Sequence, residues 1–190
     1  RRQRQRCIRD SLKGVMKSMA TTKEALMGKN TVLLFRLLKE QGTQSAVKLA
    51  FQTEHELTES RDTDTTATKD GNIVTPSALE TSLDCTSILA KGDETADKLR
   101  QALRDYEKIE IWEVDLSTKG TSGADANKYK AMYYQGYVSE WSKSPSAEDS
   151  IELSLTFTIE GVGQSGFVTL TPEQENVVKY VFKDVTPVSE

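Results

Sequence analysis

Hydrophobic and polar residues alternate without a break between Asp149 and Glu160. The apolar positions are Ile151, Leu153, Leu155, Phe157 and Ile159, and the polar positions are Glu152, Ser154, Thr156, Thr158 and Glu160. A period of two predicts a β-strand with one face on a core and the other face in water. At about 3.3 Å per residue the strand extends roughly 30 Å, which is long for a domain of this size.

Similar patterns predict further strands before and after this one. They cover residues 32–38, 47–51, 79–86, 109–116, 129–141 and 167–170. Residues 32–38 are apolar on both faces apart from Arg36, so we expect them to be covered on both sides. In the next strand we expect Val47, Leu49 and Phe51 to share one apolar face. Residues 79–86 again place acids and hydroxyls on one face.

One segment has the spacing of a helix that lies against the outside of a sheet. Its apolar positions are Ala96, Leu99, Leu103 and Tyr106. Asp93 is suited to cap its N-terminus. Glu94 and Lys98 stand four residues apart, which favours an exposed ion pair.

The two ends of the chain follow weaker patterns. Residues 1–18 have no apolar period and are expected to lie outside the fold, so that residues 19–190 form one domain. Capping patterns predict helix starts at residues 21–24 and at residues 171–174. Residues 177–182 fit a helix or a strand, and both alternatives stay open.

Residues 54–76 lose almost all apolar character. They contain six acidic residues and six threonines but only two bases, Arg61 and Lys69. Alternation resumes at Leu79, so we interpret the segment as the outer part of a long hairpin. Such a segment cannot offset its own ordering entropy, and Thr58 to Pro76 should be mobile in the free subunit.

The net charge of −4 hides a split between residues 1–18, which carry +6, and the other 172 residues, which carry −10. An acidic body does not hold nucleic acid by neutralising phosphates. No stretch approaches the roughly 18 apolar residues of a membrane span. Cys7 and Cys85 are not expected to form a disulfide, which agrees with a protein kept in a cytosol-like compartment. Cys85 is interpreted as a small buried apolar residue.

Candidate catalytic chemistry is weak. Gly161, Gly163 and Gly166 match a dinucleotide-binding spacing, but a strand follows where that motif needs a helix, so we predict a hairpin turn. His55 is the only histidine, which leaves little for a metal site or a catalytic triad. Glu54 and Glu56 lack the apolar walls that would raise a carboxyl pKa. We therefore expect no enzyme activity, no metal and no cofactor.

The ordered set of segments resembles the major tail tube proteins of bacteriophages with long, non-contractile tails. The matching stretches are Leu49-Ala-Phe-Gln-Thr-Glu-His-Glu56, Glu59-Ser-Arg61, Lys69-Asp-Gly71, Leu89-Ala-Lys-Gly-Asp93, Glu110-Ile-Trp-Glu-Val-Asp115, Tyr133-Tyr-Gln-Gly-Tyr-Val138 and Ala147-Glu-Asp-Ser-Ile-Glu-Leu-Ser-Leu155. They span roughly residues 28–184, and residues 1–18 depart from the pattern.

The resemblance implies a mainly β fold, a β-sandwich or half-barrel with one flanking α-helix and a long extended hairpin arm. It also implies hexameric rings that stack into a hollow tube, with residues 93–106 as an outer helix and residues 54–76 as an inter-subunit arm. Implied partners are further copies of the chain, a tape measure protein in the lumen, tail terminator and distal tail proteins at the ends, and phage DNA in transit without specific binding. The implied location is the virion tail, after assembly in the host cytoplasm.

We infer two groups of candidate site residues, one facing the lumen of the tube and one on the arm between subunits. The lumen candidates share a face opposite the apolar positions, and they are Glu80, Ser82, Asp84, Glu152, Ser154, Thr156 and Thr158. The arm candidates for contacts between subunits are Arg61, Asp62, Lys69 and Asp70. The alternative is a monomeric β-sandwich that binds a carbohydrate or a protein through its tyrosine-rich strand. A hydrolase is a third hypothesis, for which no set of residues fills the catalytic roles.

Overall fold

The computed structural model describes residue 25, residues 27–171 and residue 174. Its strands are β1 (Thr31–Leu37), β2 (Val47–Lys48), β3 (Gln52–Ser60), β4 (Thr63–Thr68), β5 (Gly71–Pro76), β6 (Glu80–Ile88), β7 (Ile109–Lys119), β8 (Tyr129–Ser144), β9 (Glu152–Ile159) and β10 (Gln164–Val168). One α-helix, α2 (Glu94–Asp105), and 3-10 turns at Gly28–Asn30, Leu38–Glu40 and Gly123–Asp125 complete the described part. The expectations for residues 1–18, 21–24 and 177–182 lie outside the described residues.

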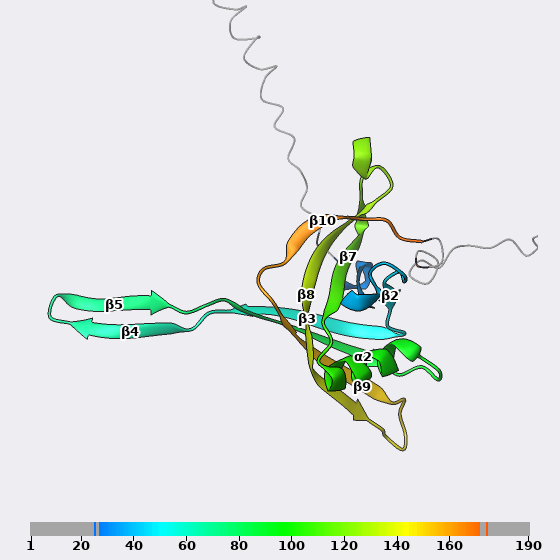
Figure 1. Ribbon diagram of the computed structural model, residues 1–190, viewed down its shortest axis with the longest axis horizontal. Coiled ribbons are helices and arrows are strands. Elements are labelled where there is room, and N and C mark those ends of the chain that lie inside the picture. The colour runs from blue at the N-terminus through cyan, green and yellow to red at the C-terminus, as the bar shows by residue number, and fades with distance from the viewer. Residues whose placement is uncertain (1–24, 26, 172–173, 175–190) are drawn as a thin grey trace, which may run out of the picture.

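Most strands belong to one antiparallel sheet that curls around a core. The order is β2-β1-β7-β8-β9-β6-β3, with β10 added to β8, while β4 and β5 form a separate two-stranded ribbon (Figure 1). The mainly β, sandwich-like fold with one flanking helix and an extended hairpin is therefore confirmed.

The core lies on both faces of β1, as the sequence predicts. The larger cluster joins Leu33 and Phe35 of β1 to α2 and to the apolar faces of β6 and β9. The smaller cluster, on the other face, joins Val32 and Leu34 to β7, β8 and Leu170. The long alternating strand is also confirmed, because Leu153, Leu155, Phe157 and Ile159 are all buried in the larger cluster.

The Gln52 side chain joins the two ends of the curled sheet. Its Oε1 accepts a hydrogen bond from the Leu33 backbone N–H at 3.0 Å, and its Nε2 donates to the Leu33 carbonyl at 2.7 Å. Nearby, His55 Nε2 on β3 lies 3.3 Å from Glu113 Oε1 on β7. These contacts bring β3 beside β1 and β7, so the sheet forms a half-barrel around the larger cluster.

Helix α2 covers that cluster largely as expected. The Asp93 carboxylate accepts a hydrogen bond from the Thr95 backbone N–H and caps the helix. Ala96, Leu99 and Ala102 are buried, but Tyr106 is 87% exposed because it ends the helix in the left-handed conformation. The expected pairing of Glu94 with Lys98 is replaced, since Lys98 contacts Glu40 and Gln44 in the segment after β1.

The second predicted strand is shorter than its pattern suggested. β2 contains two residues, and Phe51 has a positive φ of 47° that turns its side chain into solvent. Of Val47, Leu49 and Phe51, only Leu49 is buried. The chain must bend here to start β3 at the opposite end of the sheet, and that bend replaces the regular alternation.

The glycine-rich segment does not form the predicted hairpin turn. Strands β9 and β10 pair one after the other with the same edge of β8, and both run antiparallel to it. Residues 160–163 form the bulge between them. A Cβ atom at Gly163 would lie 2.3 Å from the Tyr134 ring, so only glycine lets the chain pass at this distance.

Candidate assembly surfaces

Four neighbouring strands share a polar face on the side of the sheet opposite the larger cluster. We call it the acid–hydroxyl face, and its acids and hydroxyls are Glu54, Glu56 and Thr58 on β3, Glu80, Ser82, Asp84 and Thr86 on β6, Glu152, Ser154, Thr156 and Thr158 on β9, and Glu140 and Ser142 on β8. Ile88 and Tyr137 stand on the same side by register, opposite Glu152 and Thr158. All seven lumen candidates from the sequence belong to this face.

The strand register aligns these side chains across the sheet. Asp84 stands opposite Glu56 on one side and opposite Thr156 on the other, and Thr156 Oγ1 donates a hydrogen bond to Asp84 Oδ1 at 2.6 Å. Along the four strands, which the structure describes in full, no lysine or arginine stands on this face. Because like charges directly opposite each other are unfavourable, the clustered carboxylates do not serve the stability of the isolated chain.

A buried polar network continues the same side of the sheet toward β1. Arg36 Nε donates to Glu110 Oε2 at 2.7 Å, and the Tyr133 hydroxyl donates to Glu110 Oε1, also at 2.7 Å. Gln135 Nε2 donates to the Tyr133 hydroxyl, and the Arg36 guanidinium lies 5.0 Å from the centre of the Trp112 ring. Glu110 is only 1% exposed, so these hydrogen bonds replace its contacts with water.

Sequence reasoning missed this network. The sequence shows Arg36 as an exception within an apolar run. Its partner Glu110 is 74 residues away, in a strand whose pattern does not indicate a buried carboxylate. The signal available was a single cation on a face otherwise predicted to be buried, since such a charge requires a partner.

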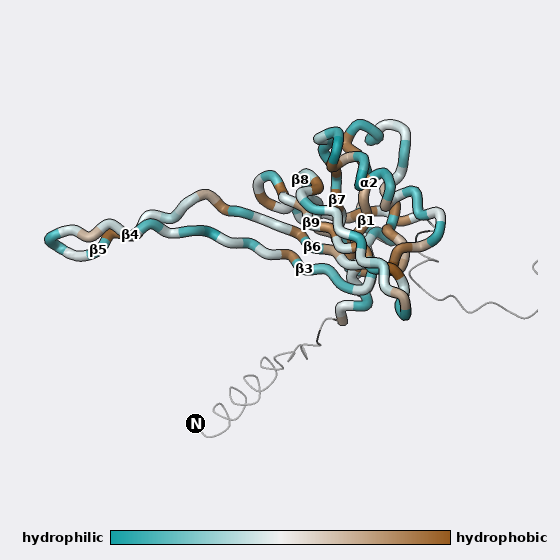
Figure 2. The backbone as a smooth tube through the Cα atoms, turned by 90° about the horizontal axis from the view of Figure 1, so that it is seen from below, coloured by the Kyte–Doolittle hydropathy of each residue, from teal (hydrophilic) through white to brown (hydrophobic). Residues whose placement is uncertain are grey.

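The arm is the hairpin that extends away from the body of the molecule, from β3 through β4 and β5 to β6 (Figure 1). Its outer ribbon pairs Thr63–Thr68 with Gly71–Pro76, and all twelve residues are exposed. Most of its length is hydrophilic or neutral, in contrast with the body (Figure 2). The long hairpin predicted from the sequence is confirmed, and its outer part is a regular ribbon.

The four arm candidates separate into two places along the hairpin. Arg61 and Asp62 connect β3 to β4, where the Asp62 carbonyl accepts a hydrogen bond from the Ser77 N–H at 2.8 Å. Lys69 and Asp70 form the turn at the tip, between β4 and β5. Within the described residues, none of these four charged groups forms a side-chain ion pair with the rest of the chain.

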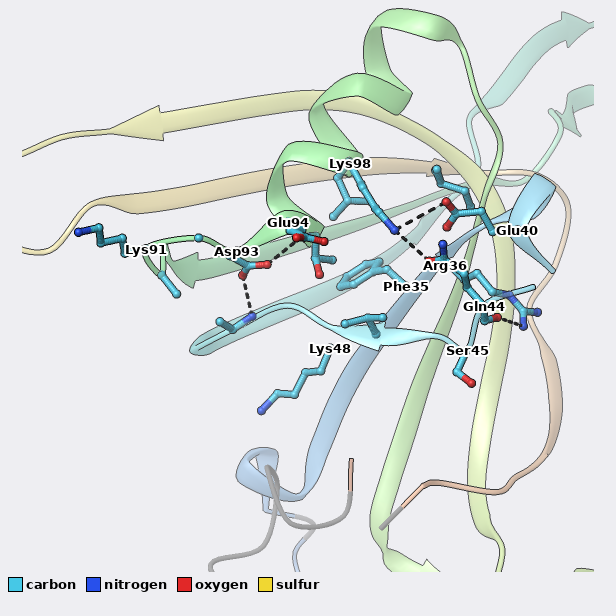
Figure 3. A pocket seen from close by; sticks show the side chains of 17 residues that line it. Phe35, Arg36, Glu40, Gln44, Ser45, Lys48, Lys91, Asp93, Glu94 and Lys98 are labelled. Carbon is cyan, nitrogen blue, oxygen red and sulfur yellow. Dashed lines mark hydrogen bonds and ion pairs between the residues drawn. The ribbon is translucent and has the colours of Figure 1, made fainter. Parts of the chain in front are cut away.

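A cavity of about 510 Å³ opens between the start of α2 and the segment that joins β1 to β2 (Figure 3). Phe35, Leu37 and Leu99 contribute buried apolar surface, and Val47 is 47% exposed at its wall. Lys98 Nζ donates to Gln44 Oε1 at 2.9 Å and lies 3.7 Å from Glu40 Oε1. The Lys98 contacts join the helix to the opposite wall of the cavity.

Burial keeps the Cys85 thiol and the Tyr134 hydroxyl of the core protonated at neutral pH. Loss of solvent raises the pKa of the Cys85 thiol to about 12. Burial, with the nearby Glu113 carboxylate, raises the pKa of Tyr134 to about 12. Among the described residues no group of three or more His, Cys, Asp and Glu is placed to hold a metal ion. The helices of the described part include none with the length and apolarity to cross a membrane.

The sequence matches the family model described as phage tail tube protein over residues 25–165. A tail protein of Staphylococcus phage phiMR25 is 34% identical over 158 residues, covering 82% of this chain and 80% of that protein. The tail tube protein gp17.1* of Bacillus phage SPP1 is 24% identical over 149 residues, which cover 78% of this chain and 54% of that protein. The chain thus spans about half the length of the SPP1 relative.

Solved structures show the same fold. The SPP1 tail tube, determined by solid-state NMR and cryo-electron microscopy, matches with a TM-score of 0.66 at 20% identity, over 87% of this chain and 95% of that one. The tail of an empty gene transfer agent particle, refined with C6 symmetry, matches with a TM-score of 0.55 at 14% identity, over 76% of this chain and 100% of that one.

Proposed function

Because this chain belongs to the phage tail tube protein family, we propose that copies of it form six-membered rings that stack into a hollow tail tube. As a member of that family it is a structural protein of the virion. The C6 symmetry of a tail with the same fold supports the six-fold ring. The tube would carry DNA from the particle into the host.

The acid–hydroxyl face is proposed as the wall of the lumen. A surface with carboxylates and hydroxyls and without cations repels phosphates, so DNA can slide along it without adhering. Glu80, Ser82, Asp84, Glu152, Ser154, Thr156 and Thr158 would line this wall. The alignment of these residues across neighbouring strands is the observation that carries the proposal.

Further partners are proposed from the same function. A tape measure protein would occupy the lumen during assembly in the host cytoplasm, and tail terminator and distal tail proteins would bind the two ends of the tube. The protein would need no cofactor and catalyse no reaction, since the proposed role consists of contacts between surfaces.

The arm is proposed to join subunits through Arg61, Asp62, Lys69 and Asp70. All twelve residues of the ribbon are exposed, so its hydrogen bonds should open readily in the free subunit. In the tube it would gain partners and become ordered, which would make polymerisation slow to start and sensitive to salt. Amide hydrogen exchange would test this step: residues 63–76 should exchange quickly in the free chain and slowly in tubes. Equal rates in the two states would contradict it.

Electron microscopy of the purified chain tests the assembly. Wild type should form tubes, and a variant with residues 60–72 replaced by a short Gly-Ser turn should remain a folded monomer. The matched control replaces the exposed loop at residues 145–149, between β8 and β9, and should form tubes normally. A wild-type chain that stays monomeric at every concentration would support the alternative, a monomeric binding module. Tubes of normal length from the arm variant would show that another surface joins the rings.

A further inference from the structure

The tip of the arm exposes two neighbouring apolar side chains, Ile73 and Val74, at 57% and 58%. Successive residues of a strand point to opposite faces, so the two lie on different sides of the ribbon. The Ile73 face also holds Asp64, Thr66 and Thr75, while the Val74 face holds Thr63, Thr65, Ala67, Asn72 and Pro76. The Ile73 face therefore combines an apolar side chain with a carboxylate, and the Val74 face is uncharged.

The cavity beside α2 combines exposed apolar surface with the lysines Lys48, Lys91 and Lys98, and its lining also includes the carboxylates of Glu40, Asp93 and Glu94. At one end of the cavity the Lys98 ammonium group already has partners, because it contacts Glu40 and Gln44. At the opposite end of the view in Figure 3 stand Lys48 and Lys91, joined to none of the other side chains drawn. Within the described part of the chain neither lysine has a carboxylate within ion-pair distance. Partial burial lowers the pKa of Lys48, so this ammonium group is desolvated without compensation.

The walls of the cavity are fixed before any ligand arrives. Asp93 binds both walls, since its Oδ1 accepts from the Thr95 N–H at 3.0 Å and its Oδ2 accepts from the Ala50 N–H at 3.2 Å. The Lys98 contacts connect the helix to the segment after β1 at a second place. A preformed cavity loses little entropy when it is filled, which favours docking of a short rigid segment.

The chain cannot fill the cavity with its own arm. The arm leaves the body on the side away from α2 and β2, so its tip and the cavity lie at opposite ends of the molecule (Figure 1). Complementary surfaces at opposite ends of one chain produce head-to-tail contacts, which either close into rings or continue as a filament. A second copy is therefore the occupant that both the position and the chemistry fit.

On the basis of the proposed function, we propose that the cavity between β2 and α2 receives the arm tip of a neighbouring copy. Ile73 would lie against Val47, and the two acids of the β4–β5 ribbon, Asp64 near its base and Asp70 beside Lys69 in its turn, would approach Lys48 and Lys91. The contact gives the arm a defined binding site. It also supplies carboxylate partners for Lys48 and Lys91, which form no ion pair within the described part of the chain.

Charge exchange tests the electrostatic part. Lys48→Asp with Lys91→Asp should raise the protein concentration needed for tube formation at least tenfold, and so should Asp64→Lys with Asp70→Lys. Combining all four changes should bring that concentration back to within about threefold of wild type. The control variant, Lys130→Asp with Lys143→Asp, changes two lysines on β8 away from the cavity. It should assemble like wild type and should not rescue the arm variant.

Cysteine cross-linking tests the apolar contact in chains that carry Cys7→Ser. A mixture of Val47→Cys and Ile73→Cys chains should give, under mild oxidation, a band at twice the 21.2 kDa chain mass. Neither chain alone should give it, and Val74→Cys, on the opposite face of the ribbon, should cross-link far less with Val47→Cys.

The two proposals fail in different ways. Wild-type tubes together with normal assembly of both charge variants, or equal cross-linking by Ile73→Cys and Val74→Cys, would overturn the docking site and leave the tail tube function intact. Absence of tubes from wild type would overturn the proposed assembly itself.

Discussion

Strand β9 and the β4–β5 ribbon are both regular β structure, but they are stabilised by different means. In β9 every second side chain is buried against the core, with Phe157 stacked on Phe35 at 5.2 Å between ring centres. In the ribbon all twelve residues are exposed. Burying a large apolar side chain contributes about 1.5–3 kcal/mol, which the ribbon gains at no position. The body thus folds on its own core, whereas the arm has the sequence of a segment that needs a partner.

The largest loss in the free energy of unfolding should appear when an apolar side chain of the body is truncated. Phe157→Ala should lower the free energy of unfolding by about 3–5 kcal/mol, because it removes the stacked ring and leaves a cavity. Thr158→Ala, one residue along on the acid–hydroxyl face, should change it by less than about 0.5 kcal/mol. Urea denaturation of both variants checks the contrast, and similar losses would mean that β9 does not separate a core face from a solvent face.

Disrupting the buried Arg36–Glu110 network should cause the next largest loss in the free energy of unfolding. Arg36→Met leaves the Glu110 carboxylate buried without its cation and should cost about 3 kcal/mol. The double variant Arg36→Met with Glu110→Met should recover part of that loss, since neither charge then remains unpaired. If denaturation shows the double variant to be less stable than Arg36→Met, the ion pair is not the reason for the loss.

A smaller effect concerns pH. The pKa of the Cys85 thiol is raised by burial from 9.0 to about 12, so above about pH 9 the unfolded chain loses a proton that the folded chain keeps. Stability is therefore lost as the pH rises through this range. Between about pH 8 and pH 10 wild type should lose roughly 1 kcal/mol more than Cys85→Ala. Parallel stability curves for the two proteins would contradict this account.

The smallest effect is expected in the arm. Ile73→Ala and Val74→Ala should each change the free energy of unfolding of the free chain by less than about 0.5 kcal/mol, because neither side chain is buried. Thermal melts of the monomer check this. A large loss in either variant would show that the arm packs on the body and would remove the contrast between the two regions.

The sequence predicts best the elements whose pattern is decided locally. Strand β9, helix α2 and the long arm follow from period-two alternation, a capped apolar stripe and the loss of apolar residues. The capping pattern at residues 171–174 is also present, since Thr171 and Gln174 exchange hydrogen bonds between side chain and backbone. These features depend on neighbours within a few residues.

The errors lie where distant parts of the chain decide the structure. Phe51 is exposed because the chain must bend toward the far edge of the sheet. Strand β10 pairs with β8 because that edge is free beyond the end of β9. Lys98 turns to Glu40, which is close only in the folded chain. The cavity beside α2 combines residues from three such segments, so no local pattern could indicate it.

A helical cryo-electron microscopy reconstruction of tubes made from the purified chain would show which way the acid–hydroxyl face is oriented. We expect six subunits per ring, with Asp84, Glu152 and Thr156 on the wall of the lumen. A map with these side chains on the outer surface of the tube, or buried between subunits, would contradict this expectation.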